Sequence, residues 1–328
     1  MRRAGLLGAL TASLCFTLPS AAVMIGFAYG VSFASDWKTA GWLHGLKLAA
    51  VVVVAQAVWG MGRKLCPDRA RVSLALAAGA LLLVVAGAIA QVGVIAAGGV
   101  VGFFLYRRSI TVSDVDAQPV SMRAHVGAAL ALVTFAALLV VLPIAARSVG
   151  DMHLAEVDAF YRSGSLVFGG GHVVLPLLRA ELVPRGFISD DAFLAGYGAA
   201  QAVPGPLFTF SAYLGAAMSA GPHRWLNGLL CLFSIFLPAW LLIGGALPFW
   251  HRLRSKAWAQ AALAGANACV VGVLLAALYR PVMSEAIHDV PDVATALVGF
   301  ALLAQWKAPS WSIVALLAAA GQWLLPSA

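Results

Sequence analysis

The sequence predicts an all-α polytopic membrane protein, on the evidence of its composition and of its long apolar runs. Of the 328 residues, 62% are apolar and 10% are charged, and the mean hydropathy is +0.92. Soluble domains have roughly 45–50% apolar and about 25% charged residues. Runs long enough for helical spans of about 17–25 residues fall at 5–30, 45–62, 126–146, 191–218, 226–249 and 258–279. With shorter runs between them, we expect about nine to eleven membrane segments.

The same features argue against several other classes of protein. Few loops are long enough to fold as a separate domain, so we do not expect an enzyme. The net charge of +8 comes from Lys and Arg in short loops, which is typical of membrane orientation rather than of nucleic-acid binding. The four cysteines are scattered without a C-x-x-C pair, so we expect packing residues and no disulfide, metal or other cofactor.

The opening residues fit either a secretory signal or a first membrane helix. Two arginines, an apolar stretch and small residues around Pro19 are typical of a signal. An internal repeat favours the helix. Pro19 in GLLGALTASLCFTLPS matches Pro238 in GLLCLFSIFLP, and Gly45 in GLKLAAVVVVAQAVW matches Gly265 in GANACVVGVLLAALY. The two matches have nearly the same offset along the chain, which indicates a duplicated unit.

Loop charges predict that the two copies have inverted topology. The loop at 62–71 carries a net charge of +3, whereas its counterpart at 280–292 carries −2. Because basic loops lie on the cytoplasmic side, equivalent loops are expected on opposite sides of the membrane, as in many secondary transporters. We therefore predict a partial first repeat at 1–108, a cytoplasmic linker at 109–125 and a complete second repeat at 126–328.

The first repeat is predicted to be incomplete. Its counterparts of Phe168 and Pro204 would fall before Met1 at the observed offset. Either the start is assigned too late or the chain is a fragment, or it is a true truncation that needs an N-terminal partner or does not transport.

Two segments of the second repeat interrupt the helical pattern. The first consists of Phe168, Gly169, Gly170, Gly171 and His172; the second contains Gln201, Pro204, Gly205 and Pro206. Helices that begin after such breaks direct unpaired backbone N–H groups and the positive end of a dipole into the protein. An anion is the ligand that this arrangement suits. The alternative is that the glycines allow close helix packing and the prolines only produce kinks.

At these two segments the sequence resembles a known family. FGGGHVVLPLL at 168–178 and QAVPGPLFTFSAYLG at 201–215 are similar to the two signature stretches of the CHR family of chromate ion transporters. The resemblance implies a secondary carrier in the cell inner membrane that moves chromate, by efflux that gives chromate resistance. Fold-level reasoning does not separate chromate from sulfate-like oxyanions, since both are tetrahedral dianions.

Four polar residues are candidates for the anion pathway. Lys47 either attracts the dianion or extends its charge to the membrane interface, and Asn267 occupies the matching place in the second copy. His172 either binds the oxyanion or a proton, or packs between helices. Gln201 either donates to the ligand or binds the carbonyls freed by the prolines. No Asp or Glu lies deep in an apolar run, so His172 is the predicted intramembrane proton carrier.

The expected partners are the oxyanion and the lipid bilayer, with a homodimer as a further option and without nucleic acid. The alternative function is a non-transporting remnant, or a half-carrier that needs an N-terminal partner.

Overall fold

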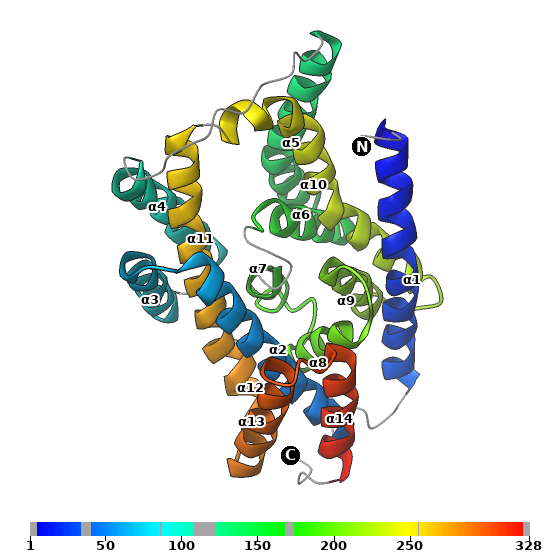
Figure 1. Ribbon diagram of the computed structural model, residues 1–328. Coiled ribbons are helices and arrows are strands. Elements are labelled where there is room, and N and C mark those ends of the chain that lie inside the picture. The colour runs from blue at the N-terminus through cyan, green and yellow to red at the C-terminus, as the bar shows by residue number, and fades with distance from the viewer. Residues whose placement is uncertain are drawn as a thin grey trace. The chain divides into compact units, whose positions relative to one another are not determined.

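The computed structural model describes residues 5–33, 41–85, 87–107, 122–167, 174–254 and 256–323. Regular structure within these ranges is helical, without a β-strand (Figure 1). Six of the described helices are long and apolar enough to cross a membrane: Thr11–Val31, Gly41–Leu65, Ile89–Tyr106, His125–Val149, Arg224–Ala246 and Ala257–Ala286. The predicted class, an all-α polytopic membrane protein, is confirmed.

The chain divides into two compact units, each built from stretches that are distant in sequence. Unit 1 comprises Met1–Ala57, Leu182–Phe233 and Ala277–Ala328, and unit 2 comprises Val58–Glu181 and Ser234–Ala276. Each unit draws on both predicted repeats. The repeat boundaries at 108 and 126 stay a prediction.

Unit 1 contains the helix pair that flanks the second predicted break. Its helices are α1 (Gly5–Phe33), the first part of α2 (Gly41–Leu65), α8 (Asp190–Ala202), η3 (Leu207–Thr209), α9 (Phe210–Met218), the start of α10 (Arg224–Arg254), η4 (Leu278–Met283), α12 (Ser284–Ala286), α13 (Val290–Ala304) and α14 (Ser310–Trp323). Helix α1 packs on α9, and α8 packs on α14. The core between α2, α8, α13 and α14 includes Leu46, Ala199, Ala296 and Leu317.

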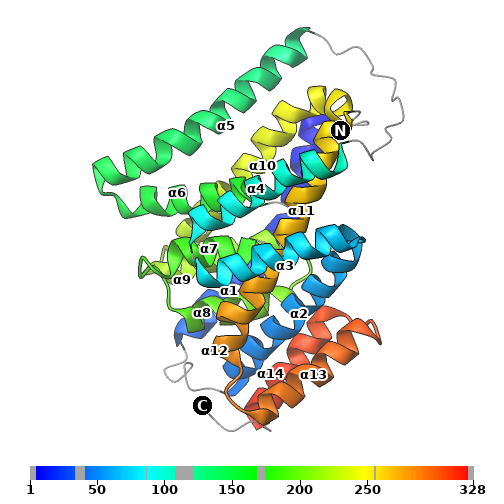
Figure 2. The same ribbon diagram turned by 90° about the vertical axis from the view of Figure 1, so that its left-hand side faces the viewer.

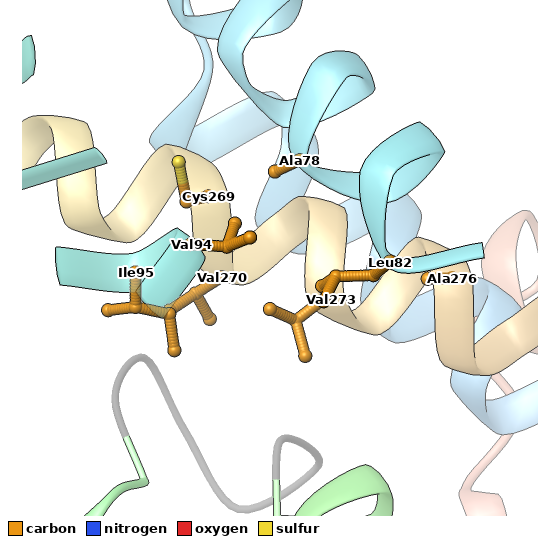
Figure 3. Close-up of a cluster of buried hydrophobic side chains, with 8 residues drawn as sticks. All are labelled: Ala78, Leu82, Val94, Ile95, Cys269, Val270, Val273 and Ala276. Atoms are coloured by element: carbon orange, nitrogen blue, oxygen red, sulfur yellow. The ribbon is translucent and has the colours of Figure 1, made fainter. Parts of the chain in front are cut away.

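Unit 2 contains two helix hairpins and the greater part of α10 and α11. Its helices are the end of α2, α3 (Arg69–Val84), α4 (Ala88–Tyr106), α5 (Met122–Val149), α6 (Met152–Ser165), α7 (Val174–Leu182), the rest of α10, and α11 (Ala257–Ala277). Helices α3 and α4 form the first hairpin, and α5 and α6 form the second (Figure 2). Figure 3 shows the core in which α3 and α4 contact α11 through residues such as Leu82, Ile95 and Val273.

Glycines let α2 and α14 of unit 1 approach at backbone distance, and a glycine of α13 packs against side chains of both. A Cβ at Gly45 of α2 would collide with the carbonyl oxygen of Leu317 in α14, and a Cβ at Gly41 would collide with that of Gly321. On α13, a Cβ at Gly299 would lie 3.1 Å from Val52 Cγ2 of α2. The close packing of α2 on α14 therefore requires glycine on α2.

Three helices of unit 2 pack through the corresponding residues. A Cβ at Gly265 of α11 would collide with the carbonyl oxygen of Gly98 in α4, and a Cβ at Gly102 would lie 2.5 Å from the carbonyl oxygen of Ala261. On α3, a Cβ at Gly79 would lie 3.2 Å from the carbonyl oxygen of Gly272. Each of these positions matches its counterpart in unit 1 at the offset of the internal repeat. The same three-helix packing thus occurs twice in the chain.

Helices α3 and α13, which take part in the two three-helix packings, also have the same kind of N-cap. Asp68 is the N-cap of α3 and accepts from the backbone N–H of Arg71 at 2.9 Å. Asp289 is the N-cap of α13 and accepts from that of Asp292 at 3.1 Å. A side-chain cap satisfies one of the free amides at a helix start. The N–H of Arg71 holds the pKa of Asp68 below its usual value, with the phenol of Tyr106 assisting.

Candidate functional site

The apolar run at 191–218 is not one helix, because the Pro-Gly-Pro segment interrupts it. Helix α8 ends at Ala202, and Val203 is extended. Pro204 and Pro206 have no N–H to continue the helical ladder, and the backbone of Gly205 has φ +156°. The chain then makes the short turn η3 before α9 begins at Phe210.

Helix α1 covers this break with the hydroxyl group of Ser20. Thr17 and Ser20 lie three residues apart, so they share a face of α1, and both are buried. Ser20 Oγ donates to the carbonyl oxygen of Pro204 at 2.6 Å. A Cβ at Gly205 would collide with Ser20 Oγ. Ser20 is a site residue that sequence reasoning missed; its signal was a pair of hydroxyls at helical spacing beside Pro19.

Gln201 presents an unpaired donor at the break. Its side chain is 8% exposed, and its Nε2 is buried without a hydrogen-bond partner. The phenol of Tyr197, one turn earlier in α8, lies close enough to interact with the side chain of Gln201. Since a buried donor without a partner costs about 1–3 kcal/mol, the amide is suited to a ligand with acceptor oxygens.

The carbonyl oxygens of the two prolines themselves are bound by groups other than Gln201. Ser20 donates to the carbonyl oxygen of Pro204. The N–H and Oγ1 of Thr209 donate to that of Pro206, each at 2.9 Å. These two proline carbonyl oxygens therefore have partners other than Gln201. The alternative in which Gln201 binds the carbonyls that the prolines free, those four residues before each proline, stays a prediction.

Lys47 lies in unit 1, where its charge is compensated. Its Nζ donates to Asp191 Oδ1 at 2.5 Å, and the lysine side chain is 12% exposed. Asp191 belongs to the first turn of α8, and Gly198 of the same helix packs against the carbonyl oxygen of Leu46. The ammonium group therefore binds a protein carboxylate in this structure.

Asn267 lies in unit 2, on the wall of a pocket of about 270 Å³. The other polar residues of this wall are Lys64, Arg71 and Gln260. Arg71 Nε lies 2.9 Å from Asp68 Oδ2, and its guanidinium carbon lies 4.8 Å from the centre of the Tyr106 ring. The pocket thus has a basic and amide lining, in which the charge of Arg71 is partly balanced.

The first predicted break, from Phe168 to His172, lies outside the described residues. The structure therefore groups Gln201 with Pro204, Gly205 and Pro206 at one break, while Lys47 contacts the far end of the same helix.

Buried acidic groups were not expected from the sequence. Glu156 in α6 has an exposed fraction of 0%, and Asp292 in α13 has one of 2%. In unit 2, Arg162 pairs with Asp158 one turn earlier in α6 and lies 3.5 Å from Glu181 of α7. In unit 1, Asp292 contacts His44 of α2. The expectation considered only acids inside apolar runs, whereas these acids lie in short helices or at a helix start and are buried by packing.

A chain with this set of apolar spanning helices is a multi-pass membrane protein. It belongs to the chromate transporter family, whose model matches residues 1–103 and 154–322.

Several curated proteins are similar to this chain over much of its length. A chromate transport protein of Pseudomonas aeruginosa is 27% identical over 335 residues, which cover 97% of this chain and 75% of that protein. A probable chromate transport protein of Synechococcus elongatus is 22% identical, over 92% of this chain and 72% of that protein. A chromate transport protein of Cupriavidus metallidurans is 24% identical, over 47% of this chain and 38% of that protein. No solved structure matches the chain.

Proposed function

We propose that this chain is a secondary carrier that moves chromate across the inner membrane by efflux, which gives chromate resistance. Its membership of the chromate transporter family and the named function of the similar proteins support chromate as the substrate. Sulfate-like oxyanions are proposed as further substrates, because they share the tetrahedral shape and double charge of chromate.

The proposed binding site is the Pro-Gly-Pro break in unit 1. One observation carries this proposal: the amide nitrogen of Gln201 is buried and has no hydrogen-bond partner. The oxygens of chromate accept hydrogen bonds, and the start of η3 and α9 after Pro206 supplies the positive end of a helix dipole. Gly205 and Ser20 fix the backbone that turns between Gln201 and this helix start.

The proposed mechanism is alternating access by two inverted repeats. The three-helix packing that recurs at the offset of the internal repeat supports a duplicated unit, and the opposite loop charges support its inversion. Lys47, Asn267 and the segment Phe168, Gly169, Gly170, Gly171 and His172 remain proposed parts of the anion pathway. Because Lys47 follows Leu46, which packs on α8, its pair with Asp191 is proposed to orient α8.

Replacement of Gln201 by Leu tests the site. A hydrogen bond to a charged group contributes about 1.5–3 kcal/mol, so Gln201→Leu should weaken chromate binding about 10- to 100-fold. The measurement is the concentration dependence of chromate transport by the purified chain in proteoliposomes.

The matched control for this substitution is Gln305→Leu, which changes an exposed glutamine at the C-cap of α13. We expect wild-type transport for the control. An unchanged half-saturation concentration in Gln201→Leu, with the protein folded, would remove the break from the binding site.

A further inference from the structure

A histidine and an aspartate from different helices form a buried pair in unit 1. His44 Nε2 of α2 lies 2.6 Å from Asp292 Oδ1 of α13, and the two side chains are 10% and 3% exposed. In a membrane protein, a buried ionisable pair is costly unless each group has a partner. This pair is not used by the proposed oxyanion site, which lies around Gln201.

The second oxygen of Asp292 is also bound. Its Oδ2 accepts from the backbone N–H of His288 at 2.9 Å, while the Asp289 cap fixes the backbone N–H of Asp292. The carboxylate is therefore held in one orientation toward His44.

An exposed imidazole lies against the buried one. The rings of His288 and His44 are stacked, with centroids 5.7 Å apart and an angle of 21° between the planes. His288 is exposed, whereas His44 is buried. His288 is therefore the exposed neighbour of the buried pair.

No further ion pair to His44 or Asp292 is found among the described residues. On α2, Lys47 follows His44 by three residues, but it is bound to Asp191 of α8. The charged groups on neighbouring elements of the described chain are Arg280 of η4, Glu285 of α12 and Asp289, and α14 has no titratable group between Ser310 and Trp323. With a neutral imidazole, the buried pair carries one negative charge; one proton on His44 brings it to zero.

The corresponding place in unit 2 lacks such a pair. Ala264 of α11 matches His44 at the offset of the internal repeat. Arg71 of α3 matches Asp292 of α13, because each is the third residue after the N-cap of its helix. Gly45 and Gly299, by contrast, have glycine counterparts in unit 2, at 265 and 79. The three-helix packing therefore does not itself require a histidine and an acid here.

We propose that His44 and Asp292 form a proton-binding site whose occupancy is linked to that of the oxyanion site. This inference rests on the proposed function. An unprotonated pair adds a negative charge to the unit that binds a dianion, and one proton removes it. Proton and oxyanion therefore bind to the same state of the carrier, and by linkage each raises the affinity for the other.

Chromate affinity of the purified protein at pH 8 and at pH 6 tests the proposal. Coupling between two sites typically changes affinity by about 5- to 150-fold. Chromate itself takes up a proton in this pH range, and this affects the wild type and the variants equally. The change in chromate affinity between pH 8 and pH 6 is therefore compared between the wild type and the variants. We expect the wild-type affinity to rise at least about fivefold more than that of Asp292→Asn or His44→Gln. Asp289→Asn, which keeps a capping side chain, should respond like the wild type.

The two ways in which this account can fail give different results. If all proteins bind chromate with the same pH response, the proton site is wrong and the proposed function stands. If the folded wild-type protein binds no chromate at either pH, the proposed function fails and the linkage fails with it. Thermal unfolding of each variant, measured in the same detergent, shows whether lost binding reflects lost folding; Asp292→Asn and His44→Gln provide two independent replacements.

Discussion

Replacement of Gly205 by Ala should reduce chromate transport about a hundredfold, because misplacement of binding groups by about 1 Å costs that much. At φ +156° the backbone of Gly205 is in a region that residues with a Cβ rarely adopt. The new Cβ would also collide with Ser20 Oγ and lie 2.8 Å from Ser20 Cβ. Either α1 or the turn between Gln201 and η3 must then move. Initial rates of chromate transport in proteoliposomes measure the effect.

Gly221→Ala separates this geometric effect from simple backbone strain. Gly221 also has a positive φ, +88°, but nothing lies within 4 Å of a Cβ placed on it. The substitution should cost about 1–3 kcal/mol of stability and leave transport near the wild-type rate. Equal losses of transport in Gly205→Ala and Gly221→Ala would show that the break has no special role.

Gly45→Ala and Gly265→Ala should each destabilise the protein by about 1–3 kcal/mol, the usual cost of overpacking. In both helices the added methyl group would collide with a backbone carbonyl oxygen of the facing helix, that of Leu317 for Gly45 and that of Gly98 for Gly265. A backbone oxygen cannot rotate away as a side chain does. The free energy of unfolding in detergent, from chemical denaturation, measures the loss.

The controls for these substitutions are not expected to destabilise the protein. Nothing lies within 4 Å of a Cβ at Gly60 of α2 or at Gly93 of α4. Since alanine is about 1 kcal/mol more favourable than glycine inside a helix, Gly60→Ala and Gly93→Ala should be neutral or stabilising. If Gly45→Ala or Gly265→Ala stabilised the protein equally, the close helix packing described above would be incorrect.

Much of the fold was predictable because it follows from local composition. The long apolar runs predicted five of the six described spanning helices, all but Ile89–Tyr106. The paired prolines at 204 and 206 predicted where the run at 191–218 is interrupted. The match of Gly45 with Gly265 was first a likeness of sequence. The structure adds that each glycine packs against a helix at the matching place in its own unit, at Leu317 in one case and at Gly98 in the other.

The candidate site was predictable only where a residue lies beside the break. Gln201 and Gly205 stand in the motif itself, whereas Ser20 contacts Pro204 from 184 residues away. The pair of His44 and Asp292 joins residues 248 apart in sequence. Such pairs depend on which helices pack together, and neither charge pattern nor hydropathy along one segment contains that information.

The position of chromium in a chromate-soaked crystal is the most direct test of the proposed site. Anomalous scattering at the chromium edge distinguishes the metal of the oxyanion from every atom of the protein. We predict a peak at the Pro-Gly-Pro break, with an oxygen of the ion within hydrogen-bonding distance of Gln201 Nε2. A peak only in the pocket beside Lys64 and Asn267, with the break empty, would contradict the account.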